Sequence, residues 1–208
     1  MDGTTHLTIG ALTGAAILRA APALATPLNH SALAAEGIFM GAAAFAALLA
    51  DVDHPGSLLG RFIPLPAAYQ FRGPTAPPKV GRRIPFTQIT IWHRGPTHSL
   101  VAAGIAGILS LVLFGWIIGL AVLAGYLSHI GVDLLNQSKV MIFWLVWKKP
   151  YVKPHFPRWR AGGGWDYLTG LAGAVGLFLL AGPMVAGHFV HMPHVHALKI
   201  VQATWKGK

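Results

Sequence analysis

Long apolar stretches alternate with polar ones along this chain, and their lengths predict helices that cross a membrane. The apolar runs cover residues 7–21, 32–50, 99–113, 116–135 and 167–189. A helix needs about 20 apolar residues to cross a bilayer, so the first run is short for a span. The tripeptide Phe-Gly-Trp at 114–116 predicts a tight turn between the third and fourth helices. We therefore predict an all-α fold, a polytopic membrane helical bundle with about five transmembrane helices in a single domain.

The composition agrees with a membrane protein and narrows the possible metal ligands. Charged residues make up 11% of the chain and apolar residues 54%, whereas roughly 25% of a typical globular chain is charged. The mean hydropathy is +0.55. The chain has no cysteine, which excludes disulfides and thiolate ligands and leaves His, Asp and Glu as the strong side-chain ligands.

Basic residues gather in two polar segments, 55–97 and 139–160, and each segment holds six of the 16 Lys and Arg residues. Five spans place both segments on one side of the membrane, which the positive-inside rule makes the cytoplasmic side. The first segment is rich in Pro and Gly, so we expect an extended surface loop with an amphipathic piece near 58–69. The net charge of +10 would also suit a nucleic-acid binder, but such a protein needs its basic residues on a soluble surface.

The same topology collects His and Asp residues at the cytoplasmic membrane face. Four groups arrive there from four helix ends, namely His6; Asp51, Asp53 and His54; His93 and His98; and His129 with Asp133. Ionisable groups at membrane depth are costly and usually functional. We therefore predict a centre for one or two divalent ions, with zinc as the expected metal and every member of these groups except His54 as a ligand.

Two of these groups also have a simpler explanation. His129 and Asp133 are four residues apart on a helix, so they can bind one ion or form an intrahelical hydrogen bond that caps the bundle. His93 and His98 flank an Arg-Gly-Pro turn, which can equally be the capped start of the third helix. Arg94 in this turn can hold a phosphate or carboxylate through two hydrogen bonds.

The acids after the second helix need a positive partner. Asp51 and Asp53 lie at the C-terminal end of that helix, where the helix dipole disfavours negative charge. A divalent metal would compensate them, and so would Arg61 or Arg94. The sequence leaves these alternatives open.

Other polar residues are assigned to supporting roles or left outside the site. Asp166, which opens the last helix, is expected to support the centre indirectly or to pair with Arg158 or Arg160. The C-terminal tail is expected to lie at the opposite interface, and it contains the histidines His188, His191, His194 and His196.

Histidines, carboxylates and one arginine at a membrane surface predict metal-assisted hydrolysis of a phosphate ester, such as a phospholipid of the cytoplasmic leaflet. The predicted catalytic residues are Asp53, His54 and Arg94, with Arg94 neutralising developing charge and His54 or an unliganded Asp acting as general acid or base. The alternative is a non-catalytic scaffold or a metal carrier. A carrier needs ligands near the midplane, whereas these lie near one interface.

Four short segments also resemble, in order, the YdjM-type family of bacterial inner-membrane, metal-dependent hydrolases. They are His6 with Leu7, ADVDHPGSLLG at 50–60, HRGPTHS at 93–99 and GYLSHIGVDLLN at 125–136. The resemblance implies a hydrolase of the inner membrane that is distantly similar to zinc-dependent phospholipase C and its nuclease relatives. Those all-helical enzymes cleave phosphodiesters at a zinc cluster and use a helical His-x-x-x-Asp ligand pair, which His129 and Asp133 match. Their further His and Glu ligands have no assigned counterpart here.

Overall fold

The computed structural model describes residues 3–24, 32–70, 79–135, 139–146, 151–152 and 164–190. Its five α-helices follow the predicted apolar runs to within a few residues. They are α1 (Gly3–Ala20), α2 (Ala32–Leu49), α3 (Leu100–Phe114), α4 (Trp116–Asp133) and α5 (Gly164–Val190). Most of the second basic segment, including Arg158 and Arg160, lies outside the described residues, as do most of the loop 22–31 and the tail 191–208.

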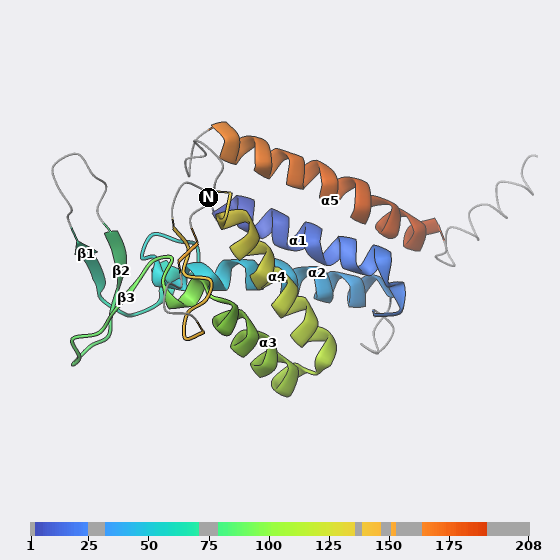
Figure 1. The fold of residues 1–208 in the computed structure, drawn as a ribbon. Coiled ribbons are helices and arrows are strands. Elements are labelled where there is room, and N and C mark those ends of the chain that lie inside the picture. The colour runs from blue at the N-terminus through green and yellow to red at the C-terminus, as the bar shows by residue number, and fades with distance from the viewer. Residues whose placement is uncertain are drawn as a thin grey trace, which may run out of the picture.

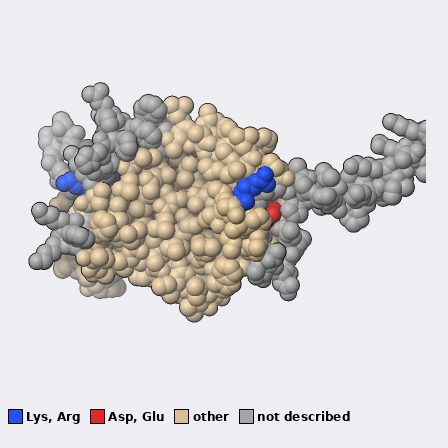
Figure 2. Space-filling view, turned by 45° about the vertical axis from the view of Figure 1, so that its right-hand side comes forward, with Lys and Arg blue, Asp and Glu red and all other residues tan. Residues whose placement is uncertain are grey.

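Three of the described helices are long and apolar enough to cross a membrane. These stretches are Leu33–Asp53, Trp116–Asp133 and Asp166–Pro183, while Leu100–Phe114 is apolar but shorter. The predicted number of five spans is therefore not confirmed, although the membrane character of the chain is. Figure 2 shows the surface that such helices offer to lipid, a broad face without Lys, Arg, Asp or Glu between charged residues near its two ends.

The polar segment between α2 and α3 contains a small sheet, which corrects the all-α prediction. Strands β1 (Ala67–Gln70), β2 (Lys79–Arg83) and β3 (Thr90–Trp92) form an antiparallel sheet in the order β1-β2-β3. The expected amphipathic piece is instead the 3₁₀ turn η3 (Gly60–Phe62) followed by β1. In Figure 1 the sheet lies beyond the ends of the helices, on the side of the N-terminus of α1.

Residue choice explains why this sheet forms in a segment rich in Pro and Gly. The β-branched and aromatic residues of β3 favour extended backbone. Gly81 of β2 pairs with Trp92, and a Cβ atom at Gly81 would lie only 2.3 Å from the carbonyl oxygen of Ile91. The glycine thus permits the close approach of the two strands, although in the sequence it suggests only a loop.

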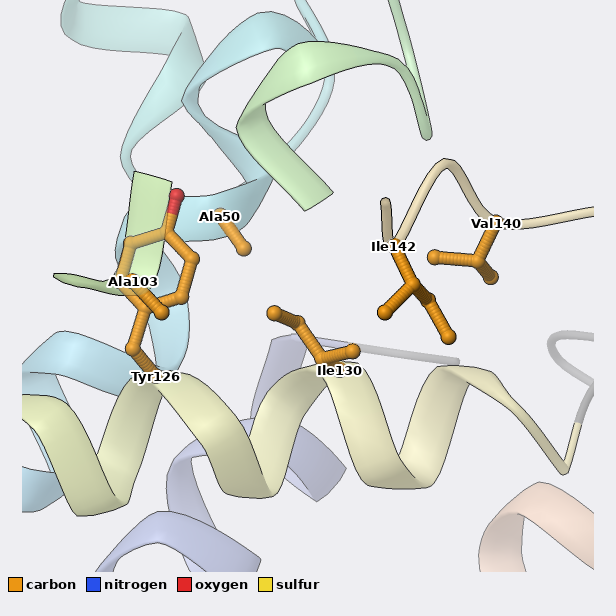
Figure 3. Packing of buried hydrophobic residues seen from close by; sticks show 6 residues of the cluster. All are labelled: Ala50, Ala103, Tyr126, Ile130, Val140 and Ile142. Atoms are coloured by element: carbon orange, nitrogen blue, oxygen red, sulfur yellow. The ribbon is translucent and has the colours of Figure 1, made fainter. Parts of the chain in front are cut away.

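Helix α4 lies at the centre of the bundle and contacts α1, α2 and α3, while α5 packs along α1. One buried cluster joins α1, α2 and α4 through Leu18, Phe39 and Ile117. A second cluster packs near the site end of α4 and is drawn in Figure 3; its members are Ala50, Ala103, Tyr126, Ile130, Val140 and Ile142. This second cluster fixes the start of α3 and the segment 140–142 against the last turns of α4.

Helices α2 and α4 cross in very close contact because a glycine lies at the crossing. A Cβ atom at Gly125 would lie 2.0 Å from the carbonyl oxygen of Ala43. Small residues at such crossings let helix backbones approach within a membrane, where packing rather than water exclusion drives association. The close crossing lies one turn before His129, so it brings that histidine against α2.

Candidate metal centre

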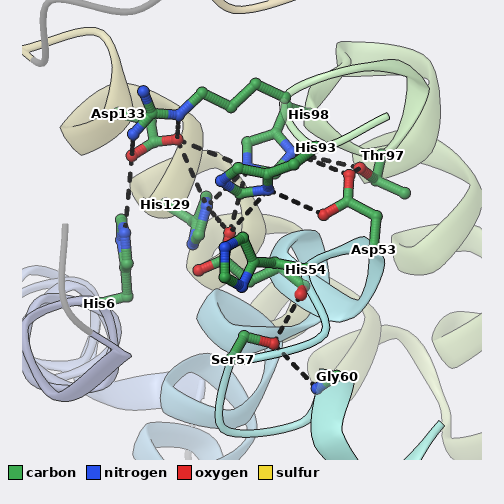
Figure 4. A network of polar contacts seen from close by, with 12 residues as sticks. His6, Asp53, His54, Ser57, Gly60, His93, Thr97, His98, His129 and Asp133 are labelled. Carbon is green, nitrogen blue, oxygen red and sulfur yellow. Dashed lines mark hydrogen bonds and ion pairs between the residues drawn. The ribbon is translucent and has the colours of Figure 1, made fainter. Parts of the chain in front are cut away.

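All seven predicted metal ligands lie together at one end of the bundle (Figure 4). Asp51 and Asp53 belong to the 3₁₀ turn η2 (Ala50–Asp53), which continues α2, and His98 ends the turn η4 (Pro96–His98). The others come from α1, from the turn after β3 and from the last turns of α4. Six of the seven are buried, namely His6, Asp51, Asp53, His98, His129 and Asp133. His93 is partly exposed.

Four of these side chains, which we call the central group, point their donor atoms at one another; the group consists of Asp51, His98, His129 and Asp133. The Nε2 atom of His98 lies 3.2 Å from His129 Nε2, 3.3 Å from Asp51 Oδ1 and 3.4 Å from Asp133 Oδ2. His129 Nε2 lies 3.6 Å from Asp51 Oδ1 and 4.0 Å from Asp133 Oδ2. Ligands about 2.0–2.1 Å from a tetrahedral zinc ion are about 3.3–3.4 Å apart. The three distances from His98 Nε2 match the edges of such a tetrahedron, and the two further distances from His129 Nε2 are longer.

The hydrogen bond made by His129 leaves the correct nitrogen free for a metal. Its Nδ1 donates to the carbonyl oxygen of Ala47 over 2.6 Å, a carbonyl that can only accept. The proton therefore lies on Nδ1, and Nε2 keeps its lone pair toward the central group. Metal-binding histidines are usually held in this way by a backbone carbonyl or a carboxylate.

Thr97 gives His98 a similar arrangement. The ring nitrogen Nδ1 of His98 lies 3.1 Å from Thr97 Oγ1, and the same hydroxyl donates a short hydrogen bond to Asp53 Oδ2. The hydroxyl proton goes to Asp53, so Nδ1 of His98 is the donor to Thr97 and Nε2 faces the central group. Burial favours the neutral ring, but hydrogen bonds to Asp133 and Asp51 outweigh it and raise the pKa of His98 to about 9. The pocket thus favours a positive charge at this point.

Arg94 binds Asp133 rather than the acids after α2. Its Nε donates to Asp133 Oδ2 over 2.9 Å and its Nη2 to Oδ1 over 3.3 Å. The backbone of Arg94 has a φ of +60°, a conformation that costs free energy in a residue with a side chain. Arg61, the other predicted partner of Asp51 and Asp53, lies instead over the ring of Phe62.

His6 reaches the centre from α1 and packs against His129. The two rings are stacked with centroids 3.8 Å apart, and His6 Nε2 lies 3.6 Å from Asp133 Oδ1. Only 1% of His6 is exposed, and neither ring nitrogen has a hydrogen-bond partner among the described residues. Buried polar atoms normally have partners because an unsatisfied one is costly, so His6 is suited to an additional ligand at this position.

Asp53, His93 and His54 form the outer side of the centre. His93 Nδ1 lies 2.9 Å from Asp53 Oδ1 and 3.7 Å from Asp51 Oδ1. The ring of His54 meets that of His93 edge to face at 4.8 Å, and its Nδ1 accepts from the amide of Gly56 over 3.1 Å. Burial and the neighbouring His93 lower the pKa of His54.

The described residues form three possible three-ligand sets, which overlap at His98 and His129. They are His6, His129 and Asp133; Asp51, His98 and His129; and Asp53, His93 and His98. His54 belongs to none of them. Of the three carboxylates of the centre, that of Asp133 pairs with a guanidinium, that of Arg94, and divalent cations suit such a set of His and Asp donors. The residues present therefore fit a bound metal.

Asp166 lies apart from these three sets. It is buried at the start of α5 and, together with Thr4, Thr5 and Thr8 of α1, lines a cavity of about 260 Å³. Thr5 Oγ1 donates to the carbonyl oxygen of Asp166 over 3.5 Å. Its expected partners Arg158 and Arg160 are outside the described part of the chain.

The sequence prediction missed three residues that support the centre, Thr97, Tyr126 and Ala47. The Tyr126 hydroxyl donates to the carbonyl oxygen of Thr97 over 2.6 Å, which ties α4 to the turn that carries His98. A sequence signal existed for two of them, because Thr97 lies inside HRGPTHS and Tyr126 precedes His129 by three residues, on the same helix face. The carbonyl of Ala47 leaves no such signal.

The comparison with protein families identifies a family for this chain. A family model described as YdjM inner membrane protein matches residues 1–192 of this chain. The matched range contains all the predicted ligands and catalytic residues. No match was found among curated proteins or among solved structures.

Proposed function

We propose a function from one premise, that this chain belongs to the YdjM inner membrane protein family. The proposal is a membrane-embedded, metal-dependent hydrolase that cleaves a phosphate ester, such as a phospholipid, at the cytoplasmic face. The observation that carries it is the convergence of donor atoms on His98 and His129, whose Nε2 atoms lie 3.2 Å apart and 3.3 to 4.0 Å from carboxylate oxygens of Asp51 and Asp133.

The expected cofactor is zinc or a similar divalent ion, in one or two copies. The central group would hold the first ion. His6 and the Oδ1 atom of Asp133 would contribute to a second position, since Asp133 directs Oδ2 to the central group and Oδ1 to His6. When bound, such ions act as Lewis acids on a phosphoryl oxygen and on water.

The outer residues would bind the substrate and move protons. His93 donates from Nδ1 to Asp53 Oδ1, so its Nε2 is free to accept a proton. The neutral ring of His54 accepts at Nδ1 from Gly56 and therefore carries its proton on Nε2, from which it can donate a hydrogen bond to a phosphoryl oxygen. Arg94 holds Asp133 in place and would offset charge that develops on the phosphate.

Substrate would approach from the side of His93. The side chain of His93 is 23% exposed, whereas those of His98 and His129 are fully buried. We therefore propose that the buried ligands lie behind a partly exposed rim formed by His93 and His54. A catalytic metal centre needs one open coordination position for water or substrate, and the rim is where one would be available.

A second candidate function is non-catalytic metal binding, as in a scaffold or a metal carrier. The observation that favours it is the central group itself, because four protein ligands in a buried setting are typical of closed, structural zinc sites. A carrier or scaffold would bind the ion without turning over a phosphate ester.

The test compares metal content with turnover in the full-length protein purified in detergent. Zinc content is measured by mass spectrometry after repletion, and hydrolysis is assayed on phospholipids and on soluble phosphate esters. Asp53→Ala should keep the central ion but lose turnover, His129→Ala should lose both, and the exposed control Gln88→Ala should keep both. Wild-type protein that holds less than one zinc per chain would refute the metal centre. Wild-type protein that holds zinc without any turnover would favour the non-catalytic role.

A further inference from the structure

Arg82, in the middle strand of the sheet, is a buried charged residue outside the metal centre. Only 6% of it is exposed, and its guanidinium donates short hydrogen bonds to the carbonyl oxygens of Gly60 and Leu65. No carboxylate forms an ion pair with Arg82 in the described part of the chain, and the sequence contains no Asp or Glu between Asp53 and Asp133. Burial of a charge is costly without a partner. The two carbonyls are therefore what this guanidinium stabilises.

The loop whose Gly60 carbonyl binds Arg82 is also connected to Asp51 of the metal centre by hydrogen bonds. The amide of Gly60 donates to Ser57 Oγ over 2.9 Å, and Ser57 Oγ donates to the carbonyl oxygen of Asp51 over 2.6 Å (Figure 4). The amide of His54 also donates to that carbonyl over 2.9 Å. A Cβ atom at Gly60 would lie 2.0 Å from the carbonyl oxygen of His54. The loop is thus tightly wound, and a shift of Gly60 is passed on to Asp51.

The same strand also holds the histidine side of the centre. The amide of His93 donates to the carbonyl oxygen of Val80 over 2.8 Å, which extends the pairing of β2 with β3. Strand β2 therefore binds the loop behind Asp51 through Arg82 and the start of HRGPTHS through Val80. These two attachments set the position of His93 relative to Asp51, now 3.7 Å between Nδ1 and Oδ1.

We infer that Arg82 is a positioning residue for the metal centre and acts through Gly60 and Ser57 on Asp51. The inference rests on the proposed function, because it assumes that the centre binds a metal. Arg82 touches neither the ion nor the substrate. Its role is to fix the acids of η2 against the histidines of the next segment, as partners one step removed from a metal commonly do.

The test measures zinc affinity by competition with a chelator, and the absorption spectrum of the cobalt-substituted protein, for full-length variants in detergent. Arg82→Lys keeps the charge but cannot reach two carbonyls at fixed geometry, so zinc affinity should fall by about 10-fold to 100-fold and the cobalt spectrum should change. The matched control is Arg83→Gln, since Arg83 is the exposed neighbour that bonds Gln88. It should bind zinc as the wild type does.

A milder variant keeps the inference testable if Arg82→Lys folds poorly. Ser57→Ala removes the link between Gly60 and Asp51 and should also weaken zinc binding, with an unchanged helical circular dichroism spectrum. If both residues act along one path, the double variant should bind no more weakly than the weaker single variant. Wild-type affinity in folded Arg82→Lys and Ser57→Ala, or purely additive losses, would overturn the inference alone. Failure of the wild type to bind zinc would refute the proposed function and the inference together.

Discussion

The Nε2 atoms of His98 and His129 lie 3.2 Å apart, although 31 positions separate the two histidines in the chain. The Nδ1 atom of His98 donates a hydrogen bond to Thr97 Oγ1, and that of His129 donates one to the carbonyl oxygen of Ala47. Two nitrogen lone pairs would therefore face each other unless a proton or a metal ion lies between them. Hydrogen bonds to Asp133 and Asp51 outweigh burial and raise the pKa of His98 to about 9, so these carboxylates favour a proton on its Nε2 when no metal is bound.

The first prediction concerns which histidines retain the ion. His129→Ala removes a donor of the central group, so zinc affinity should fall by more than the roughly 10-fold to 100-fold typical of an indirect partner. His54→Ala removes a histidine that is adjacent in sequence to Asp53 but outside every ligand set, so zinc content should remain that of the wild type. Zinc per chain, measured by mass spectrometry after dialysis, checks both. Equal losses in the two variants would contradict the assignment of the central group.

The second prediction concerns the ion pair between Arg94 and Asp133. Arg94→Gln leaves the buried carboxylate without this guanidinium, and breaking a buried pair from one side typically costs about 3–5 kcal/mol. We expect a large loss of stability in the metal-free protein and a smaller one in zinc, because a bound cation would also neutralise Asp133. Thermal unfolding in detergent with chelator or with zinc measures the difference.

The control for this prediction is Arg61→Gln. Arg61 is exposed and lies over the ring of Phe62, so its replacement should change the unfolding free energy by no more than about 0.5 kcal/mol. The same destabilisation of Arg94→Gln with and without zinc would indicate that the ion does not share Asp133 with Arg94.

The sequence predicts that His6, Asp51, His98 and His129 lie together. Each of them is at or near the end of an apolar run, and the order of the spans places all four of these ends at one membrane face. This step needs only the apolar runs and the charge bias, which local composition records well. Contacts between particular helices do not enter this prediction. The bounds of the five helices follow for the same reason, since each run is long and uniform.

The partners of individual atoms depend instead on contacts between distant segments. The sequence suggested Arg61 or Arg94 as the partner of Asp51 and Asp53, but the Arg94 guanidinium bonds Asp133 of α4. The sheet was missed because Gly81 and the prolines of its segment are typical of loops, whereas the pairing that makes it a sheet is between strands. Tertiary contacts of this kind leave little local signal.

The third prediction concerns the side of the membrane on which the site lies. The chain has no cysteine, so a single cysteine can report accessibility. Arg83→Cys places one in the sheet and Trp116→Cys places one at the exposed turn between α3 and α4. By the positive-inside rule, a membrane-impermeant maleimide added to intact bacterial cells with a permeable outer membrane should label Trp116→Cys. It should label Arg83→Cys only after the inner membrane is opened. The reverse pattern would place the centre on the outer face.

The fourth prediction links helix packing to metal binding. Gly125→Ala puts a Cβ atom 2.0 Å from the carbonyl oxygen of Ala43, so α2 and α4 must separate, at a cost of about 1–3 kcal/mol for overpacking. His129 and Ala47 lie one turn further along the same two helices, and separation would stretch the 2.6 Å hydrogen bond between them. We therefore expect Gly125→Ala to lose both stability and zinc affinity.

The control is Gly131→Ala in the same helix, where a Cβ atom would meet nothing within 4 Å. In this variant the helix should gain up to about 1 kcal/mol and zinc affinity should not change. Thermal unfolding and chelator competition measure the two effects, and a Gly125→Ala protein that is destabilised but binds zinc normally would show that the Ala47 carbonyl is not needed to orient His129.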